Sequence, residues 1–350
     1  MAAATPIGWG EPAPWITAPT ASSPEFVLDT AAGRFILLLF LPPDPERQGR
    51  TLKALAANQA LFDDVRVSAF VVMGDPRAVA GVRDMRGLRW YRDGDGAIRR
   101  RFGVDGADAP AWMLLDPTLR VMGHAGADRT ESVFETIRSL PQPADHAGVS
   151  VVAPVLIAPR ILDPDLCARL IALMDRGDAA FTGVMRDVGE RTVAVMDKHK
   201  KRRDVTVADP GLCAEIRQML TARLFPQIRH AFQFQVTEIE RYIVARYDSG
   251  DGGVFRAHRD NTTRQTANRK FACSINLNDG FEGGDLRFPE YGLTRHRPPS
   301  GGAVVFSCAL LHEVTPMIRG SRYAFLPFFY DEDGVRILEA YWRSIAGGAD

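Results

Sequence analysis

Cysteine is absent from the first 166 residues of this 350-residue chain. The second half holds four cysteines, none in a C-x-x-C pair: Cys167, Cys213, Cys273 and Cys308. This spacing predicts neither a disulfide framework nor a zinc knuckle. It also excludes thiol and disulfide-exchange chemistry from the first half, because no thiol is present there. We expect the four thiols to be reduced and packed in the interior.

A net charge and long apolar runs are also missing. The 43 basic and 43 acidic residues leave a formal charge of zero, so we expect neither a nucleic-acid partner nor a membrane partner. The longest purely apolar run, residues 35–41, is far shorter than the ~20 residues that cross a bilayer. The first twenty residues lack the basic-then-apolar order of a secretory signal. We therefore expect a cytoplasmic protein.

The length indicates two domains, at about 150 residues each, and the first domain shows an α/β pattern. Residues 35–41 form a continuous apolar run and residues 65–72 are mostly apolar, which is typical of strands buried on both faces of a sheet. A helical pattern over residues 48–62 separates them, so this β-α-β unit predicts parallel pairing. Further elements are expected as strands over 111–115 and 119–123 and a helix over 130–140.

One stretch of the first domain resembles a known family. Residues 95–104 read Asp-Gly-Ala-Ile-Arg-Arg-Arg-Phe-Gly-Val, and residues 109–116 read Ala-Pro-Ala-Trp-Met-Leu-Leu-Asp. Together with the order of strands and helices, this sequence resembles the thioredoxin-like domain of peroxiredoxins over residues 23–140. We assign residues 1–145 to that domain. The resemblance implies a cis peptide bond before Pro110.

The chain departs from this family where the reactive cysteine would begin a helix. Residues 41–50 contain no thiol, so the domain cannot act as a thiol peroxidase. The resemblance implies a groove beside the expected cis proline in which extended chain can dock. We therefore expect a module that presents substrate or pairs two chains as a homodimer, with a passive spacer as the alternative.

A second domain is expected over residues 151–345, after a polar linker over residues 142–150. Asp163-Pro164 and Asp209-Pro210 are N-cap and first-turn signals for two amphipathic helices. From Thr237 onward the pattern changes to short β segments broken by glycine, proline and asparagine. This pattern predicts an antiparallel sandwich or barrel.

The second domain also carries a metal-ligand pattern. His258 and Asp260 are two residues apart, so on a strand they project to the same face. His312 follows a buried β segment that ends at Phe306 and supplies a third ligand. Two histidines and one carboxylate on one face of a metal form the facial triad of non-haem iron(II) oxygenases. We therefore predict a metal site at these three residues.

Other residues near the triad in the sequence strengthen this hypothesis. Arg322 lies ten residues after His312, and residues 282–289 read Glu-Gly-Gly-Asp-Leu-Arg-Phe-Pro. Together these features resemble the 2-oxoglutarate- and iron(II)-dependent dioxygenases of the prolyl 4-hydroxylase-like branch, from about residue 151 to 342. The resemblance implies a double-stranded β-helix, or jelly roll, with iron(II) and 2-oxoglutarate as cofactors and ascorbate as a stimulant of turnover.

The same resemblance implies roles for single residues. It assigns catalytic roles to His258, Asp260 and His312 as iron ligands, and to Arg322 as the group that binds the far carboxylate of 2-oxoglutarate. Tyr247 matches a tyrosine that hydrogen-bonds this cosubstrate. Asn276 matches a second such contact, although a turn or strand-edge role fits this asparagine equally well.

The implied activity is hydroxylation of an unactivated C–H bond, with release of succinate and CO₂. The substrate is expected to be a prolyl or other amino-acid residue or derivative, with a small natural-product molecule as the alternative. A binding or scaffold protein with an inactive oxygenase fold is a rival hypothesis, and a ferroxidase-like or hydrolytic metalloprotein is a third.

A dense basic run, residues 197–204, lies between the two helices of the second domain. Such a run is usually a solvated loop. The alternative is that Arg202 or Arg203 binds an acidic group of the substrate.

Overall fold

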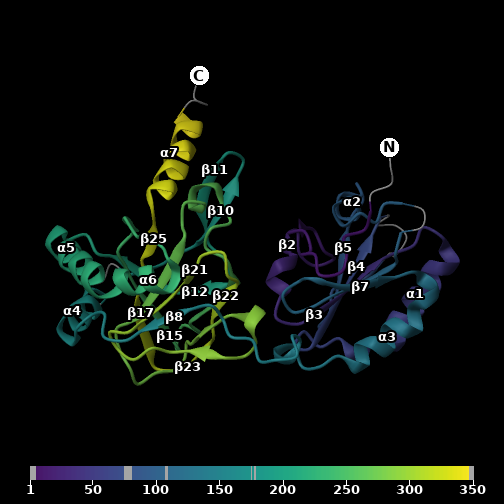
Figure 1. Cartoon of the computed structure of the whole chain (residues 1–350), viewed down its shortest axis with the longest axis horizontal. Helices are drawn as coiled ribbons and strands as arrows, with labels where there is room; N and C mark the ends of the chain where they lie inside the picture. Colours follow the sequence, from purple (N-terminus) through teal and green to yellow (C-terminus); the bar gives the residue numbers. More distant parts are fainter. Residues whose placement is uncertain (1–4, 75–80, 107–108, 175, 177–178, 347–350) are drawn as a thin grey trace. The chain divides into compact units, whose positions relative to one another are not determined.

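The computed structural model describes residues 5–74, 81–106, 109–174, 176 and 179–346 (Figure 1). The chain divides into two compact units. One comprises Met1–Ala153 with Pro289–Leu293, and the other comprises Pro154–Phe288 with Thr294–Asp350.

The first unit is built on a five-stranded mixed sheet. Its strand order is β5 (Leu88–Arg92), β4 (Val67–Met73), β3 (Phe35–Phe40), β6 (Trp112–Leu115) and β7 (Val121–Ala125). The β3–β4 and β4–β5 pairs are parallel, whereas β6 and β7 add antiparallel strands. The parallel pairing predicted for the first β-α-β unit is therefore confirmed, while β5 was not predicted.

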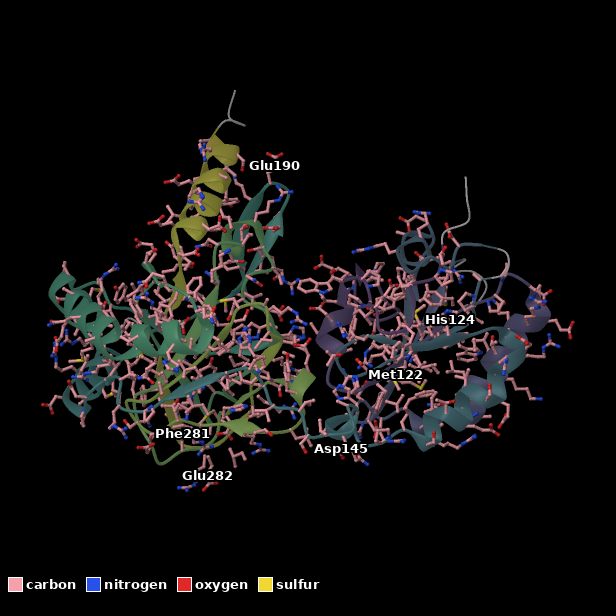
Figure 2. The ribbon with its side chains drawn as sticks, in the orientation of Figure 1. Met122, His124, Asp145, Glu190, Phe281 and Glu282 are labelled. Carbon is pink, nitrogen blue, oxygen red and sulfur yellow. The ribbon has the colours of Figure 1, made fainter. Side chains whose placement is uncertain are left out.

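Helices α1 (Pro45–Ala57) and α3 (Thr130–Ser139) pack with this sheet around one core. Asp44 caps α1 by accepting a hydrogen bond from the backbone N–H of Arg47 at 2.8 Å, and Pro45 occupies the first turn, where a missing N–H costs nothing. All six residues of β3 are buried, as expected for a strand covered on both faces. The unit also contains α2 (Ala97–Phe102), β1 (Thr17–Ala18) and β2 (Phe26–Val27). His124 lies on β7 (Figure 2).

The predicted cis bond before Pro110 is wrong, because no peptide bond in the described part of the chain is cis. Trans is the ordinary state of an X–Pro bond, by roughly 0.5–1 kcal/mol. With a trans bond the chain already reaches its pairing position, since the backbone N–H of Phe40 donates to the carbonyl of Ala111 at 2.8 Å.

The second unit is dominated by antiparallel sheets. The larger sheet has the path β14 (Glu238–Glu240), β25 (Phe328–Tyr330), β17 (Phe271–Asn276), β24 (Ser321–Phe325), β15 (Ile243–Asp248), β13 (Arg203–Thr206) and β9 (Ala180–Phe181), with β21 (Ala303–Ser307) and β8 (Leu156–Ala158) joined through β17. The smaller sheet runs β12 (Lys200–Lys201), β16 (Val254–His258), β22 (His312–Val314), β19 (Leu286–Arg287) and β20 (Arg295–His296). The predicted antiparallel β architecture is confirmed.

Helices α4 (Pro164–Met174), α5 (Pro210–Met219) and α6 (Phe225–Phe232) pack with the larger sheet, and a π-helical turn over Leu220–Leu224 joins the last two. Both predicted caps are present, with Asp163 accepting from Leu166 N at 3.0 Å and Asp209 from Leu212 N at 2.6 Å. The shared core is formed by apolar helix and strand residues, among them Leu166, Leu170, Ile216, Leu220, Val244, Ile275, Val305 and Phe325.

A hairpin and a C-terminal helix complete the second unit. The hairpin is formed by β10 (Val184–Val188) and β11 (Arg191–Val195), with Glu190 at its turn (Figure 2). The backbone N–H of Thr192 donates to the hydroxyl of Tyr341 at 3.0 Å, which ties β11 to α7 (Glu332–Ala346). A short antiparallel pair links β18 (Glu282–Gly283) and β23 (Met317–Arg319).

Short 3-10 turns occur in both units. In the described residues they are Leu28–Ala31, Gln59–Leu61, Ala127–Arg129, Pro143–Asp145, Arg264–Thr266 and Pro289–Tyr291.

All four cysteines are free thiols, as predicted. Cys167, Cys273 and Cys308 are buried and Cys213 is half-buried. Burial raises the pKa of each of these thiols. Separately, none of the helices in the described ranges is long and apolar enough to span a bilayer.

The burial of β4 generates a stability prediction. Val71 is fully buried, whereas Val65 is 58% exposed two residues before the same strand. Val71→Ala should destabilise the N-terminal sheet by about 2 to 3 kcal/mol through lost burial and a residual cavity, and Val65→Ala should change its stability by less than about 0.5 kcal/mol. Hydrogen exchange of the β3 and β4 amides against denaturant measures both changes. Equal effects would contradict the assigned burial.

Candidate active site

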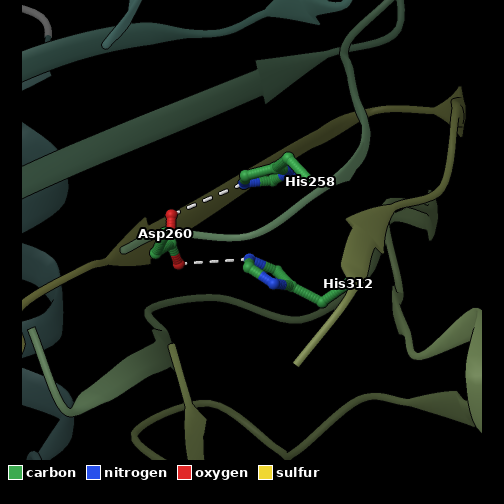
Figure 3. A group of neighbouring side chains, drawn as sticks. All are labelled: His258, Asp260 and His312. Carbon is green, nitrogen blue, oxygen red and sulfur yellow. Dashed lines mark ion pairs between the residues drawn. The ribbon is translucent and has the colours of Figure 1, made fainter. Parts of the chain in front are cut away.

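Two neighbouring strands of the smaller sheet bring the predicted metal ligands together. His258 ends β16 and His312 begins β22, and the two residues are direct cross-strand partners. Asp260 follows two residues after His258. The three side chains converge, and their ligand atoms all lie within 4.8 Å of one another (Figure 3). The predicted triad is therefore assembled in the structure.

The hydrogen bonds of the two imidazoles leave one nitrogen of each free for a metal. The Nδ1 atoms of His258 and His312 lie 2.7 and 3.0 Å from the carbonyl oxygens of Arg256 and Leu310. A carbonyl only accepts, so each Nδ1 carries the proton and each Nε2 presents a lone pair. These Nε2 atoms lie 3.6 Å from Asp260 Oδ1 for His258 and 3.2 Å from Oδ2 for His312.

The electrostatics favour the protonation states that bind a metal. Burial and the nearby His312 lower the pKa of His258 from 6.5 to about 4, against the opposing effect of Asp260. Burial alone would raise the pKa of Asp260, but the two imidazoles hold it well below its usual value. The cluster therefore offers a neutral imidazole at His258 and an ionised carboxylate at neutral pH, which is the donor set of a facial iron(II) site.

A β-bulge shapes the wall beside the triad. Phe255 pairs with Val314 while His258 pairs with His312, so β16 contains one more residue than β22 between these pairs. Residues three apart on a regular strand would face opposite sides of the sheet. Here the Phe255 ring stacks on the His258 ring, with centroids 3.5 Å apart and planes inclined by 19°. The bulge therefore lets an aromatic side chain fix the plane of a ligand imidazole.

Arg322 lies on β24 and is 2% exposed. Its Nε donates to Asn276 Oδ1 at 2.9 Å and its Nη2 donates to Ser274 Oγ at 2.7 Å. Its Nη1 is buried and has no hydrogen-bond partner among the described residues. A buried N–H donor without an acceptor is costly, so this atom is suited to an anionic ligand such as the carboxylate predicted for it.

Asn276 holds Arg322 in place with one polar atom and binds the chain with the other. Its Oδ1 accepts from Arg322, and its Nδ2 donates to the carbonyl of Pro298 at 2.7 Å. Both polar atoms of the amide are thus used inside the protein. The residue acts as a positioning group at the end of β17. Its Nδ2 carries a second N–H, and the direct cosubstrate contact that the sequence suggested stays a prediction.

Tyr247 is the cross-strand partner of Arg322 in the β15–β24 pair and is 1% exposed. Its hydroxyl accepts a hydrogen bond from Arg202 Nη1 at 3.3 Å, so its own proton remains available for a second acceptor. The cosubstrate contact predicted for this tyrosine stays a prediction.

The expectation of a solvated loop over residues 197–204 holds for the exposed turn at Lys198 and His199 but is wrong from Lys200 onward, where β12 and β13 begin. Lys200, Arg202 and Asp204 are buried, whereas Lys201 is exposed. Arg202 forms a two-pronged ion pair with Asp204, with Nε–Oδ1 at 2.6 Å and Nη2–Oδ2 at 2.7 Å. Burial and the charge of Arg202 lower the pKa of Lys200 to about 7. The run buries its charges because β12 and β13 place alternate residues inward.

The triad, Arg322, Tyr247 and Arg202 line one pocket. Its other lining residues are Arg241, Phe255, Ala272, Cys273, Ser274, Leu286, Phe306, Val314, Leu326, Pro327 and Phe328. A mostly apolar wall with a few convergent polar groups is typical of a small-molecule site. The residues present fit both implied groups: the triad fits iron(II), and Arg322 Nη1 with the Tyr247 hydroxyl fits a carboxylate.

Sequence reasoning missed part of this lining. The sequence left Arg202 and Arg203 as open alternatives. The burial of Lys200, Arg202 and Asp204 shows an i, i+2 alternation that a strand interpretation of this run would have found. Arg241 follows β14 and carries no recognisable pattern. Arg203, the other alternative, instead pairs with Asp251, with Nε–Oδ2 at 3.0 Å.

Comparisons with known proteins point to the same segment. Residues 242–330 match the family model described as the 2OG-Fe(II) oxygenase superfamily. A PKHD-type hydroxylase of Paraburkholderia xenovorans is 37% identical over 100 residues, which are 26% of this chain and 42% of the relative. A PKHD-type hydroxylase of Pseudomonas fluorescens is 34% identical over 94 residues, covering 24% of this chain and 41% of the relative. The chain thus spans less than half the length of these relatives.

Solved structures give weaker likenesses. A Pseudomonas putida prolyl-4-hydroxylase is 22% identical with a TM-score of 0.38, covering 54% of this chain and 96% of that one. A Trichoplax adhaerens prolyl hydroxylase, solved with a hypoxia inducible factor peptide, is 18% identical with a TM-score of 0.41, covering 52% and 86%. Taking the family match with the geometry, the C-terminal half of the chain contains a segment that matches the 2OG-Fe(II) oxygenase superfamily model and is similar to PKHD-type hydroxylases, and this segment holds the candidate facial triad His258, Asp260 and His312.

Proposed function

We propose that this protein is a hydroxylase that uses 2-oxoglutarate and O₂ to oxidise an unactivated C–H bond. One observation carries the proposal: the His-Asp-His cluster and the unpartnered Nη1 of Arg322 belong to the same pocket. A keto acid bound to a metal at the triad would need an anchor for its far carboxylate, and Arg322 supplies one. A ferroxidase or hydrolase would have no use for this second group.

The roles of the residues follow from their contacts. When bound, iron(II), 2-oxoglutarate and dioxygen supply the oxidising chemistry, with succinate and CO₂ as the accompanying products. His258, Asp260 and His312 would hold the metal through Nε2, one carboxylate oxygen and Nε2. Arg322 and Tyr247 would orient the cosubstrate by donating to its far carboxylate. Phe255, Phe306 and Val314 keep the surroundings apolar, which strengthens these polar interactions.

The prime substrate we propose is a prolyl or other amino-acid residue or derivative. The hydroxylase names of the similar Paraburkholderia and Pseudomonas proteins support hydroxylation as the reaction, and the resemblance to prolyl 4-hydroxylase-like enzymes suggests this substrate class. A small natural-product molecule is the alternative. A non-catalytic scaffold is disfavoured, because the donor set of the triad and the anchor are both complete.

For the N-terminal unit we propose a thioredoxin-like module that presents substrate or forms a homodimer. Support comes from its sheet, in which parallel β3 and β4 are extended by the antiparallel strands β6 and β7, with α1 and α3 packed in the same core. No thiol accompanies this fold, so its surface is what it contributes.

The triad predicts metal dependence. His258→Ala, Asp260→Ala and His312→Ala should each weaken iron(II) binding by more than about 100-fold, since even outer contacts of metal ligands contribute 10- to 100-fold. Each variant should also lose 2-oxoglutarate consumption. Anaerobic calorimetry and succinate release measure the two effects. His230→Ala, an exposed histidine on α6, is the matched control, and a triad variant with full turnover would refute the assignment.

Arg322 predicts a separate effect on the cosubstrate. Arg322→Ala should weaken 2-oxoglutarate binding by about 2 to 4 kcal/mol, the cost of losing a buried charged partner, while iron(II) binding is kept. Asn276→Ala should have a smaller effect in the same direction, because it frees the guanidinium without removing it. Titration of both variants with 2-oxoglutarate measures which of them loses more affinity for this cosubstrate. Unchanged affinity in Arg322→Ala would place the anchor elsewhere.

The homodimer is tested by mass. Sedimentation of the full chain should give twice the 38.5 kDa of one chain, and a fragment starting at residue 151 should lose that association. A monomeric full chain would rule out dimerisation by the N-terminal unit.

A further inference from the structure

Arg241 is a charged side chain in the active-site pocket for which the proposed chemistry has no use. It lies between β14 and β15 and lines the pocket together with Arg202, Arg322 and Asp260. Its Nε is buried and has no hydrogen-bond partner among the described residues. Its guanidinium carbon lies 4.3 Å from the ring centroid of Phe328, also in the pocket wall, which is a typical position for an arginine held on an aromatic face.

The acidic groups that act on Arg241 or on its neighbour Arg202 are already engaged. Glu240, its chain neighbour, is bound by Arg269, whose Nε lies 3.0 Å from both carboxylate oxygens. Asp204 is paired with Arg202. Asp260 belongs to the candidate metal-ligand triad with His258 and His312. Arg241 therefore has no carboxylate of its own, unlike the other two arginines next to it.

The charge balance of the pocket points the same way. Its charged lining groups, apart from the histidines, are the arginines Arg202, Arg241 and Arg322 and the single acid Asp260. Iron(II) and doubly charged 2-oxoglutarate cancel each other and leave this excess unchanged. Because 2-oxoglutarate takes the free donor of Arg322 and Asp204 takes Arg202, the uncompensated positive charge remains at Arg241.

Two further features support a ligand-binding role. The backbone of Arg241 has φ +51°, a left-handed conformation that is unfavourable for a residue other than glycine and is found disproportionately at functional sites. Burial, together with the charges of Arg269 and Arg202, lowers the pKa of Arg241 to about 10, against Asp260 and Glu240. The side chain nevertheless stays charged at neutral pH, so an anionic partner would relieve an existing cost.

We infer that the prime substrate carries a carboxylate and that Arg241 binds this carboxylate while the reacting carbon faces the metal-ligand triad. This inference rests on the proposed function, and it narrows the substrate class to acids. The carboxylate could belong to a free amino-acid derivative or to an acidic residue of a peptide. Arg241 would set both the specificity and the orientation of either substrate, because a guanidinium binds a carboxylate through two parallel hydrogen bonds.

The first test uses acetate as the probe and needs no knowledge of the substrate. The full chain is loaded with Zn(II), which does not support turnover, and saturated with 2-oxoglutarate so that Arg322 is occupied. Binding of ¹³C-acetate is measured by NMR line broadening at constant ionic strength, with acetamide as the uncharged isostere. Acetate should bind and acetamide should not, and Arg241→Gln should weaken acetate by about tenfold or more, as for a lost charged hydrogen bond.

Matched variants separate this site from its alternatives. Arg229→Gln removes an exposed arginine of α6 and should leave acetate binding unchanged, while Arg241→Lys should retain part of it. Arg322→Gln should weaken 2-oxoglutarate more than Arg241→Gln does. Equal acetate affinity in the wild type and Arg241→Gln would overturn the inference. So would a loss of 2-oxoglutarate affinity in Arg241→Gln as large as that in Arg322→Gln.

A second test distinguishes the source of the carboxylate. With iron(II), succinate release is compared for N-acetyl-L-proline and its amide, and for end-blocked peptides that contain glutamate or glutamine. Stimulation by the acid of one pair identifies the source, and stimulation by the amides to the same extent would overturn the inference. Absence of any 2-oxoglutarate consumption by iron-loaded wild type would instead refute the proposed hydroxylase, whatever the acetate result.

Discussion

The pairing of β16 with β22 is the constraint on which the active site depends. It places His258 opposite His312, and a slip of one residue would turn one imidazole to the other face of the sheet. The bulge between Phe255 and His258 keeps the aromatic ring on the same side as the ligand. The pocket is thus defined by backbone hydrogen bonds, and its side chains need little adjustment to receive a metal.

Around this metal cluster the protein has buried more positive charge than its own acids neutralise. Buried arginines are costly unless they are paired, and two of the four near the pocket are paired with acids, Arg202 with Asp204 and Arg269 with Glu240. The other two are Arg322, whose Nη1 has no partner among the described residues, and Arg241, whose Nε has none. A folded protein tolerates unpaired buried donors where a ligand supplies the missing acceptor. The unpaired donors of this pocket therefore indicate that its ligands are anionic.

The sequence was sufficient for those features that rest on periodicity or on chemically distinctive spacing. The H-x-D pair, the two proline-started helices and the parallel β3–β4 unit all follow from local rules. Arg202 was ambiguous, because Lys201 and Arg203 beside it give the charge density of a solvated loop. Long-range packing determines the place of Arg241, the β16 bulge and the hydrogen bond by which Asn276 positions Arg322. Such packing leaves no local pattern in the sequence. The cis bond at Pro110 was inferred from resemblance alone, and the pairing of Phe40 with Ala111 is achieved without it.

The four cysteines have a consequence for experiments on this protein. Each thiol is at least half-buried and has a raised pKa, so at neutral pH each remains protonated and unreactive. A cysteine introduced at an exposed position would then be the most reactive thiol of the chain. Fluorophores or spin labels could be attached there selectively without first replacing the native residues, which would allow motions around the pocket to be followed in the otherwise unaltered protein.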